Sequence, residues 1–370
     1  MSVAGDIAVD SDDVIARGLE TWATALRIID VFAVAPAASG GIWLQARSGP
    51  VRDHFMSELR RFVGADVPWR RIPVSITDDR LLGGLDLTAT LSSGSPVFER
   101  GLLADLDGGI CVVPMAERIE MGLAARLASV MDSGSVVVER DGLRDRAHSR
   151  FGLVAIDEAA SEDDAQLAAK LTERLAFRID LSAIPLSCVR ATDASIVERS
   201  KHARILDARR RVDRVDVPSE LMVALAHASA GLGVYGTRPL LMSVAVARAI
   251  AALDGRDTAE MSDAALAGQW VLAHRATQLP VPPEPQPDDA DPPEDPPEQD
   301  GPDDDKGQAE DEEDTSSSID LPDELVLDAV KAAVPEDLLA RLMGQAAGRE
   351  RAQTSGPAGV RTASAVRGRP

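Results

Sequence analysis

Short β-branched runs alternate with segments of helical spacing from about residue 12 to residue 190, and this alternation restricts the possible folds strongly. Strands that alternate with helices predict a mostly parallel sheet that is covered by helices on both faces. In the last helical segment Leu167, Leu171 and Leu175 recur at a spacing of four residues. The expected strands are 42–45, 72–76, 110–113, 136–139 and 153–156, and the expected helices are 14–31, 51–63, 117–131 and 163–176.

The strand signal disappears in a second zone, from about residue 194 to residue 276. Glycines at positions 231, 233, 236 and 255 separate its helical patterns. We therefore expect an α/β domain over 12–190 and an all-helical domain over 194–276. The expected helices of this second domain are 194–210, 217–230, 238–254 and 259–275.

The remaining sequence is dominated by an acidic, proline-rich stretch at 280–318. It has ten prolines between 280 and 302, and residues 281–314 contain sixteen acidic residues and one lysine. Such a composition cannot bury enough apolar surface to offset the entropy of ordering, so we expect a disordered linker. An amphipathic helical segment is expected at 319–345 and a flexible tail at 346–370.

Composition and charge exclude several classes of protein. No apolar run approaches the ~18 residues of a membrane span, and the acidic N-terminus lacks the order of a secretory signal. The two cysteines, Cys111 and Cys188, are predicted to be buried, reduced thiols of a cytoplasmic protein. The five histidines form no i, i+4 pair, so no metal site is expected. The net charge of −22 disfavours nucleic acid as a partner, although 336 residues outside the acidic stretch carry only −7 of it.

The first strand–loop–helix unit corresponds to a phosphate loop that has lost its key side chains. A working loop is G-x-x-x-x-G-K-[ST], in which the lysine reaches the outer phosphates and the hydroxyl holds Mg²⁺. Residues 46–53 keep Gly49 but have Arg52 at the lysine position, Asp53 at the hydroxyl position and Pro50 in place of a backbone donor. Two interpretations stay open: an ordinary turn that never bound nucleotide, or a weak phosphate site at Gly49 and Arg52, with help from Arg47.

The second expected catalytic element is a strand that ends in Asp-Glu, which would hold the metal and activate water. The candidate strand, 110–113, is followed by Pro114 and Met115, and neither side chain can do this. Glu117 comes two residues too late. Because two independent catalytic positions have changed, we expect slow or absent ATP hydrolysis by this chain.

Four further segments give the order of these pieces a specific meaning: DDRLLGGLDLTATLSSGSPVFERGLLADLDGGICVV, DSGSVVVERDGLRDRAHSRFGLVAI, LTERLAFRIDL and GTRPLLMSVAVARAIAALDGRD. With the altered loop GGIWLQARSGPVRD, they resemble the D-subunit family of magnesium chelatase over residues 14–275. The resemblance implies an α/β fold of AAA+ type, with a parallel sheet, an all-helical lid and a disordered acidic linker. It also implies an integrin-like I domain beyond Pro370.

The resemblance implies a role as a scaffold subunit in the ATP-dependent insertion of Mg²⁺ into protoporphyrin IX, on the route to chlorophyll or bacteriochlorophyll. The expected partners are the I subunit, an AAA+ ATPase that carries ATP and Mg²⁺, and the porphyrin-binding H subunit. The chain itself is expected to hold no cofactor firmly and to assemble into a ring. Two alternatives stay open: a stand-alone ATPase of MoxR-like type that remodels a metalloenzyme, and a structural adaptor that assembles through its acidic linker.

The resemblance implies a functional role for two arginines of this sequence. Arg174 falls at the position of an arginine finger, which would reach a nucleotide held by a neighbouring subunit. Its alternative role is an ion pair near Glu173. Arg238 falls at the position of a lid arginine that senses a nucleotide in its own subunit, or else forms a salt bridge between lid and sheet.

One acidic pair departs from the family pattern, and one acidic segment matches it only superficially. Asp157 and Glu158 occupy the first sensor region, where the active family subunit has an asparagine, and this departure favours inactivity. Residues 314–318 (DTSSS) match the DxSxS metal motif of an I domain literally. They follow an acidic run and not an apolar strand, so no metal site is expected there.

Overall fold

A parallel sheet of five strands forms the centre of the protein, in a computed structural model that describes residues 11–140, 143–159, 167–190 and 197–278. The strand order is β2-β5-β8-β1-β9, and each neighbouring pair is parallel. This arrangement confirms the expected α/β fold of AAA+ type. The strands are β1 (Gly41–Gln45), β2 (Trp69–Arg71), β5 (Ile110–Val113), β8 (Gly152–Asp157) and β9 (Phe177–Asp180).

Successive residues of the strands point into two separate cores, one on each face of the sheet. Ile42, Leu44 and Val154 pack on one face, beneath the helices α1 (Ser11–Val34) and α2 (Pro50–Val63). Cys111, Val113, Leu153 and Ala155 pack on the other face, beneath α5 (Met121–Ser133). The side-chain period of two that defines a strand therefore fills both layers. Both cysteines are free and buried, as expected.

One of the expected strands was wrong in place, and another is present but lies outside the parallel sheet. The strand expected at 72–76 ends at Arg71, since Pro73 has no N–H to continue the ladder. The segment 136–139 is extended but lies outside the parallel sheet, in a hairpin of β6 (Ser135–Arg140) with β7 (Leu143–His148). The short strand β9 was not expected at all.

The helix expected at 163–176 is also shorter than its leucine spacing suggested. The described part forms only α6 (Ala169–Thr172), and residues 160–166 lie outside the described residues. Leu167, Leu171 and Leu175 are nevertheless all buried in the second core. From Glu173 the chain turns and enters β9 directly, so the repeated leucines mark burial without a continuous helix.

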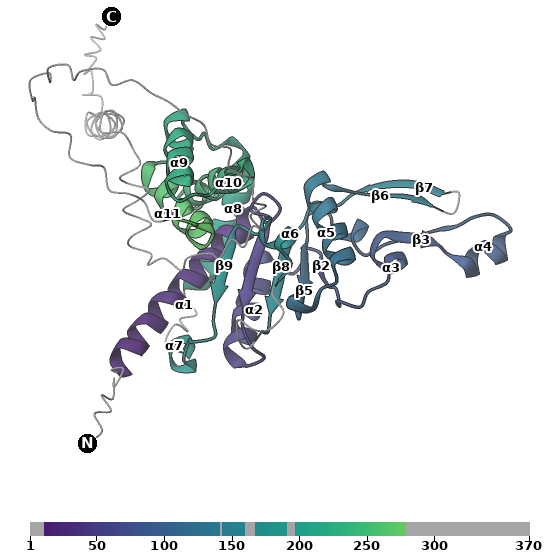
Figure 1. The fold of residues 1–370 in the computed structure, drawn as a ribbon, viewed down its shortest axis with the longest axis horizontal. Helices are drawn as coiled ribbons and strands as arrows, with labels where there is room; N and C mark the ends of the chain where they lie inside the picture. Colours follow the sequence, from purple (N-terminus) through teal and green to yellow (C-terminus); the bar gives the residue numbers. More distant parts are fainter. Residues whose placement is uncertain (1–10, 141–142, 160–166, 191–196, 279–370) are drawn as a thin grey trace, which may run out of the picture.

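The all-helical zone packs on the first face of the sheet, against α1 and β9 (Figure 1). Its helices agree with the expected ones and share one continuous core with the sheet. The expected boundary near 190–194 and the segments expected at 280–318, 319–345 and 346–370 lie wholly or partly outside the described residues. The helices are α8 (Val197–Arg211), α9 (Ser219–Gly231), α10 (Thr237–Leu253) and α11 (Met261–Leu272), and α7 (Leu186–Arg190) precedes them.

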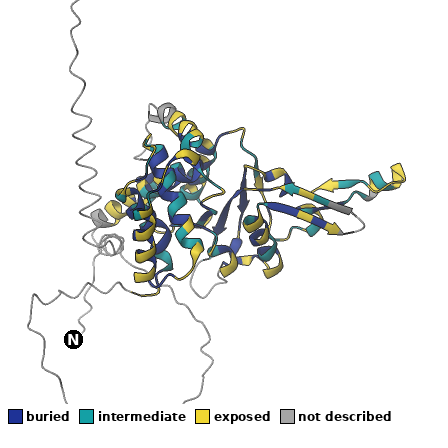
Figure 2. Cartoon of the chain, turned by 90° about the horizontal axis from the view of Figure 1, so that it is seen from above, coloured by how far each residue is buried: buried dark blue, intermediate teal, exposed yellow. Residues whose placement is uncertain are grey.

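Two extensions project from the sheet on the side away from the helical zone (Figure 1). One is the β6–β7 hairpin, and the other is built from four short elements whose tip is largely exposed (Figure 2). At that tip Leu91 is 85% exposed. Within the described ranges no helix is both long and apolar enough to cross a membrane. The four short elements are α3 (Asp78–Leu82), β3 (Gly83–Leu85), α4 (Leu87–Ser93) and β4 (Phe98–Arg100).

Candidate functional site

The altered phosphate loop lies at the carboxyl end of β1, where α2 begins at Pro50. Gly49 caps this helix in an extended conformation, with φ 166° and ψ 174°. A side chain at position 49 would meet no heavy atom within 4 Å, so the backbone does not require glycine here. A cavity of about 360 Å³ lies beside the loop. The loop has the position of a phosphate loop without its close-packed glycine geometry.

Arg52, which replaces the lysine, is occupied by partners within the chain. Its Nη1 lies 2.8 Å from Oε1 of Glu158, and its Nη2 donates to the Ser48 hydroxyl at 2.9 Å. Its side chain is only 15% exposed, whereas that of the neighbouring Asp53 is 73% exposed. Arg52 is thus held against Glu158 and Ser48 within the chain.

The carboxylates at this edge of the sheet also have partners. Glu117 is buried, and its Oε2 accepts the backbone N–H of Glu158 at 3.1 Å. Asp157 is buried, and it accepts the indole N–H of Trp43 at 2.9 Å and the backbone N–H of Ala159 at 3.0 Å. Among the residues that the structure describes, no group of His, Cys, Asp or Glu is arranged to hold a metal ion. Glu117 and Asp157 are thus held by hydrogen bonds within the chain.

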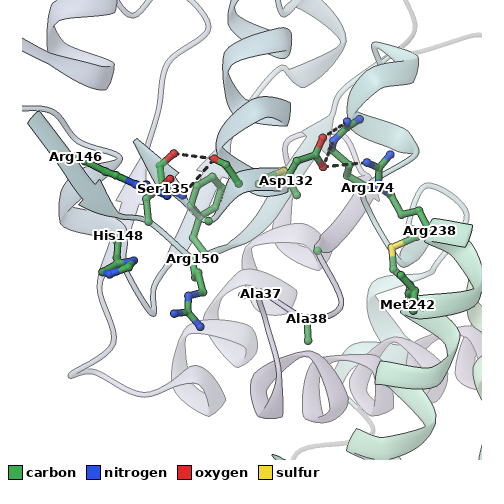
Figure 3. A pocket seen from close by; sticks show the side chains of 17 residues that line it. Ala37, Ala38, Asp132, Ser135, Arg146, His148, Arg150, Arg174, Arg238 and Met242 are labelled. Carbon is green, nitrogen blue, oxygen red and sulfur yellow. Dashed lines mark hydrogen bonds and ion pairs between the residues drawn. The ribbon is translucent and has the colours of Figure 1, made fainter. Parts of the chain in front are cut away.

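The two predicted site arginines, Arg174 and Arg238, converge on one carboxylate, that of Asp132 at the end of α5 (Figure 3). Arg174 binds it with two nitrogens, Nε to Oδ1 at 2.9 Å and Nη2 to Oδ2 at 2.5 Å. Arg238 adds Nη2 to Oδ1 at 3.0 Å, and its Nη1 lies 3.6 Å from Glu173. The hydrogen bond from Arg174 lowers the pKa of Asp132, so this carboxylate is charged at neutral pH.

This cluster lies at the opposite end of the sheet from Arg52. The carbonyl oxygen of Arg174 lies only 1.9 Å from where a Cβ of Gly40 would stand, and Gly40, at φ +72°, immediately precedes β1. Arg52 follows the other end of β1, and five strand residues span about 16 Å. In this structure Arg238 forms an ion pair that joins the helical zone to the end of α5. Its role as a sensor of nucleotide stays a prediction.

A further arginine, Arg275, supports the turn that carries Arg174. Its Nη2 donates to the carbonyl oxygens of Thr172 at 3.1 Å and Leu175 at 2.5 Å, which flank Arg174 in sequence. Its Nη1 donates to the carbonyl of Val271 at 2.5 Å, within the last helix of the helical zone. Burial lowers the pKa of Arg275 to about 10, so it remains a cation at neutral pH. Sequence reasoning did not find this residue, because its acceptors are backbone atoms about a hundred residues away.

The arginine cluster opens onto a cavity of about 650 Å³ between α5, the β6–β7 hairpin and α10. The hairpin and the chain just after it contribute Arg146, His148 and Arg150 on the side opposite Asp132 (Figure 3). Sequence reasoning missed these three as well. Their i, i+2 spacing was visible in the sequence, but only the hairpin places them at the cavity.

Comparison with known proteins identifies one matching domain family and several similar proteins. A family described as the AAA lid domain matches residues 222–299. The chain is 36% identical over 95% of its length to the magnesium-chelatase 60 kDa subunit of Cereibacter sphaeroides, and it covers 56% of that subunit. It is 37% identical over 92% of its length to the 60 kDa subunit of Rhodobacter capsulatus, covering 55% of it. The chain thus spans about half the length of these relatives.

More distant relatives extend the comparison to another subunit and to a solved structure. The magnesium-chelatase 38 kDa subunit of Rhodobacter capsulatus is 28% identical over 57% of the chain, which covers 64% of that subunit. A Cytophaga hutchinsonii protein, provisionally assigned as an ATPase, has a similar fold with a TM-score of 0.50 and 14% identity. That match covers 72% of this chain and 89% of the other, and it supports the fold alone.

Proposed function

We propose that this chain acts, as a member of the D-subunit family of magnesium chelatase, as an AAA+ scaffold subunit that assists ATP-dependent insertion of Mg²⁺ into protoporphyrin IX. In this role it assembles with the I-type ATPase subunit, which holds ATP and Mg²⁺. The porphyrin is bound by the H subunit, and the protomers form a ring in the cytoplasm. The chain has no ATPase activity of its own.

The observation that carries the proposal is the contrast between the two ends of the sheet. At the carboxyl end, Arg52 is paired with Glu158 and the metal-binding carboxylates of a working site are missing. At the amino end, two arginines from different parts of the fold meet at an open cavity. The chain has thus lost the groups that hold a nucleotide and kept those that can serve a neighbour's nucleotide.

Arg174 is the residue proposed to act in trans. A planar guanidinium can place two N–H groups on the oxygens of a transferring phosphoryl group and offset the charge that develops there. Asp132 holds this guanidinium in one orientation before the neighbour arrives, which reduces the entropy lost on engagement. Arg238 binds the carboxylate of Asp132 as well, so the helical zone takes part in the contact that we propose with the neighbouring subunit.

The two alternative functions receive less support. A stand-alone MoxR-like ATPase requires a phosphate loop that grips nucleotide, and the replacement of its lysine by Arg52 and of its hydroxyl by Asp53 opposes this. The relatives matched by sequence that are reported above are all magnesium-chelatase subunits, which does not favour the alternative either. An adaptor that binds only through its acidic stretch gives no reason for the arginine cluster.

Two measurements on the full-length chain test the proposal. Titration with a fluorescent ATP analogue is expected to show no saturable binding, and tight binding with hydrolysis would establish the stand-alone ATPase instead. Deletion of residues 281–318 is expected to leave binding to the I-type subunit intact. Loss of that binding on deletion would favour the adaptor.

A further inference from the structure

The hairpin side of the arginine cavity carries a basic stripe. Along β7 and the residues after it, Arg146, His148 and Arg150 are exposed, whereas Ala147 is half-buried and Ser149 is buried. Alternate residues of an extended chain share one face, so the three basic side chains lie on the face that lines the cavity.

Arg150 is placed in the cavity by its packing. Its side chain runs over Gly134, where a Cβ would stand 3.2 Å from Cγ of Arg150. Gly134 ends α5 at φ +62°, two residues after Asp132. The same helix end thus positions the Asp132 cluster on one side of the cavity and Arg150 on the other.

The charges around the cavity are unbalanced. Its lining contains four arginines and a single carboxylate, Asp132, which Arg174 and Arg238 already share, and Glu173, outside the lining, lies 3.7 Å from Arg174 and 3.6 Å from Arg238. In the described part of the chain, no carboxylate pairs with the side chain of Arg146 or Arg150. The excess positive charge therefore lies on the hairpin side, and arginines that face the cavity from both sides favour a compact ligand of high negative charge, because both sides can contact it at once.

We propose that Arg146 and Arg150 form the second wall of a phosphate-binding cleft, opposite Arg174 and Arg238, that receives the phosphates of a nucleotide held by a neighbouring subunit. This proposal rests on the scaffold function proposed above and extends it. Arg174 acts on the reacting phosphoryl group, and the hairpin arginines bind the phosphates in ground state and transition state alike. Their loss therefore weakens binding, whereas loss of Arg174 slows the reaction.

The acidic stretch at 281–314 is a competing occupant, since it carries sixteen acidic residues. Carboxylates spaced along an extended chain match a compact, two-walled cavity less well than a triphosphate does. The phosphate is therefore the ligand that the cavity favours, and the acidic stretch becomes an outcome of the test.

The test uses the full-length chain with Arg146→Ala and Arg150→Ala combined, and inorganic tripolyphosphate as the probe in calorimetry. The expected result is about a tenfold loss of affinity for each arginine removed, with a shallower salt dependence. In the assembly with the I-type subunit, the KM for ATP should rise while kcat changes little. Arg100→Ala combined with Arg204→Ala is the matched control, because both side chains are 59% exposed and lie outside the cleft.

Three outcomes would overturn the proposal. Unchanged tripolyphosphate affinity in the Arg146→Ala, Arg150→Ala variant would show that the hairpin wall binds no phosphate. An unchanged KM for ATP would show that the cleft does not meet the neighbour's nucleotide. If replacing the acidic residues of 281–314 by their amides raises tripolyphosphate affinity more than tenfold, the cleft belongs to the chain's own acidic stretch. The scaffold function fails separately, if Arg174→Ala leaves kcat of the assembly unchanged.

Discussion

Replacing Arg275 by methionine should displace the guanidinium of Arg174 and so reduce its catalytic effect, although Arg174 itself is unchanged. Methionine keeps most of the length and the apolar contacts of the arginine stem but cannot donate hydrogen bonds. The substitution removes both bonds from the helical zone to the 172–175 turn, at 3.1 Å to the Thr172 carbonyl and 2.5 Å to the Leu175 carbonyl. The turn then remains fixed by the pairing of Arg174 with Asp132, by the hydrogen bond from the Ala176 N–H to the Ser39 carbonyl at 3.1 Å, and by the packing of the Arg174 carbonyl against Gly40.

The expected size of the effect follows from these contacts. A hydrogen bond from a charged group contributes about 1.5–3 kcal/mol, so the loss of the two bonds to the turn should lower the free energy of unfolding by about 3–6 kcal/mol, and the bond to the Val271 carbonyl is lost as well. A displacement of about 1 Å at a reacting group costs up to about a hundredfold in rate. We therefore expect kcat of the mixed ATPase to fall by about ten- to a hundredfold, with little change in KM.

The assay is a double-mutant cycle on the ATPase of the full-length chain mixed with the I-type subunit. If Arg275 acts by positioning Arg174, the Arg275→Met change should have little further effect once Arg174→Ala is present, which gives a coupling energy of at least about 1 kcal/mol. Additive losses would refute the positioning role. Arg256→Met is the matched control, because Arg256 binds Asp263 at 2.6 and 2.7 Å within the helical zone and makes no contact with the turn.

Three further predictions concern the same region. Gly40→Ala should lower the free energy of unfolding by several kcal/mol, measured by urea denaturation, because its Cβ would stand 1.9 Å from the Arg174 carbonyl oxygen; an unchanged midpoint would contradict the close contact. Asp132→Asn should raise tripolyphosphate affinity of the isolated chain by about tenfold, since Arg174 and Arg238 lose the carboxylate they share, and a weaker affinity would show that orientation outweighs charge. Burial lowers the pKa of His274 well below 6.5, so its contribution to stability is complete above pH 6.5 and is lost by about 1.4 kcal/mol per unit as the pH falls below it. Urea denaturation between pH 7 and 5 should show this slope, and His274→Gln should reduce it.

The elements that the sequence predicted well are those whose burial alone decides their structure. The strands β1, β5 and β8 are near-continuous apolar runs because helices cover both faces of the sheet. The strand expected at 72–76 failed because Pro73 cannot continue the ladder, although Ile72 still donates to the Val112 carbonyl at 2.8 Å. The strand β9 (FRID) is as short as β5 but has polar residues at every second position, so it lacks the continuous apolar run that marks β5.

The sequence identified the two arginines of the candidate site, but it did not predict that they lie side by side. Arg174 and Arg238 were identified separately, yet their meeting depends on Asp132, which lies 42 and 106 residues away in sequence. No local pattern distinguishes this aspartate from other exposed acidic residues. The same holds for Glu158, which is 106 residues from Arg52 in sequence and pairs with it beside the altered phosphate loop. Long-range pairs of this kind require the fold to be known.

The measurement that tests the central claim most directly compares Arg174→Ala with Arg52→Ala in one assay, the ATPase of the full-length chain assembled with the I-type subunit. The account predicts that Arg174→Ala lowers kcat by at least about a hundredfold, as expected for an arginine finger, while Arg52→Ala leaves it within about twofold. The reverse result, loss of turnover with Arg52→Ala and normal turnover with Arg174→Ala, would show that the chain uses its own phosphate loop and would contradict the scaffold function.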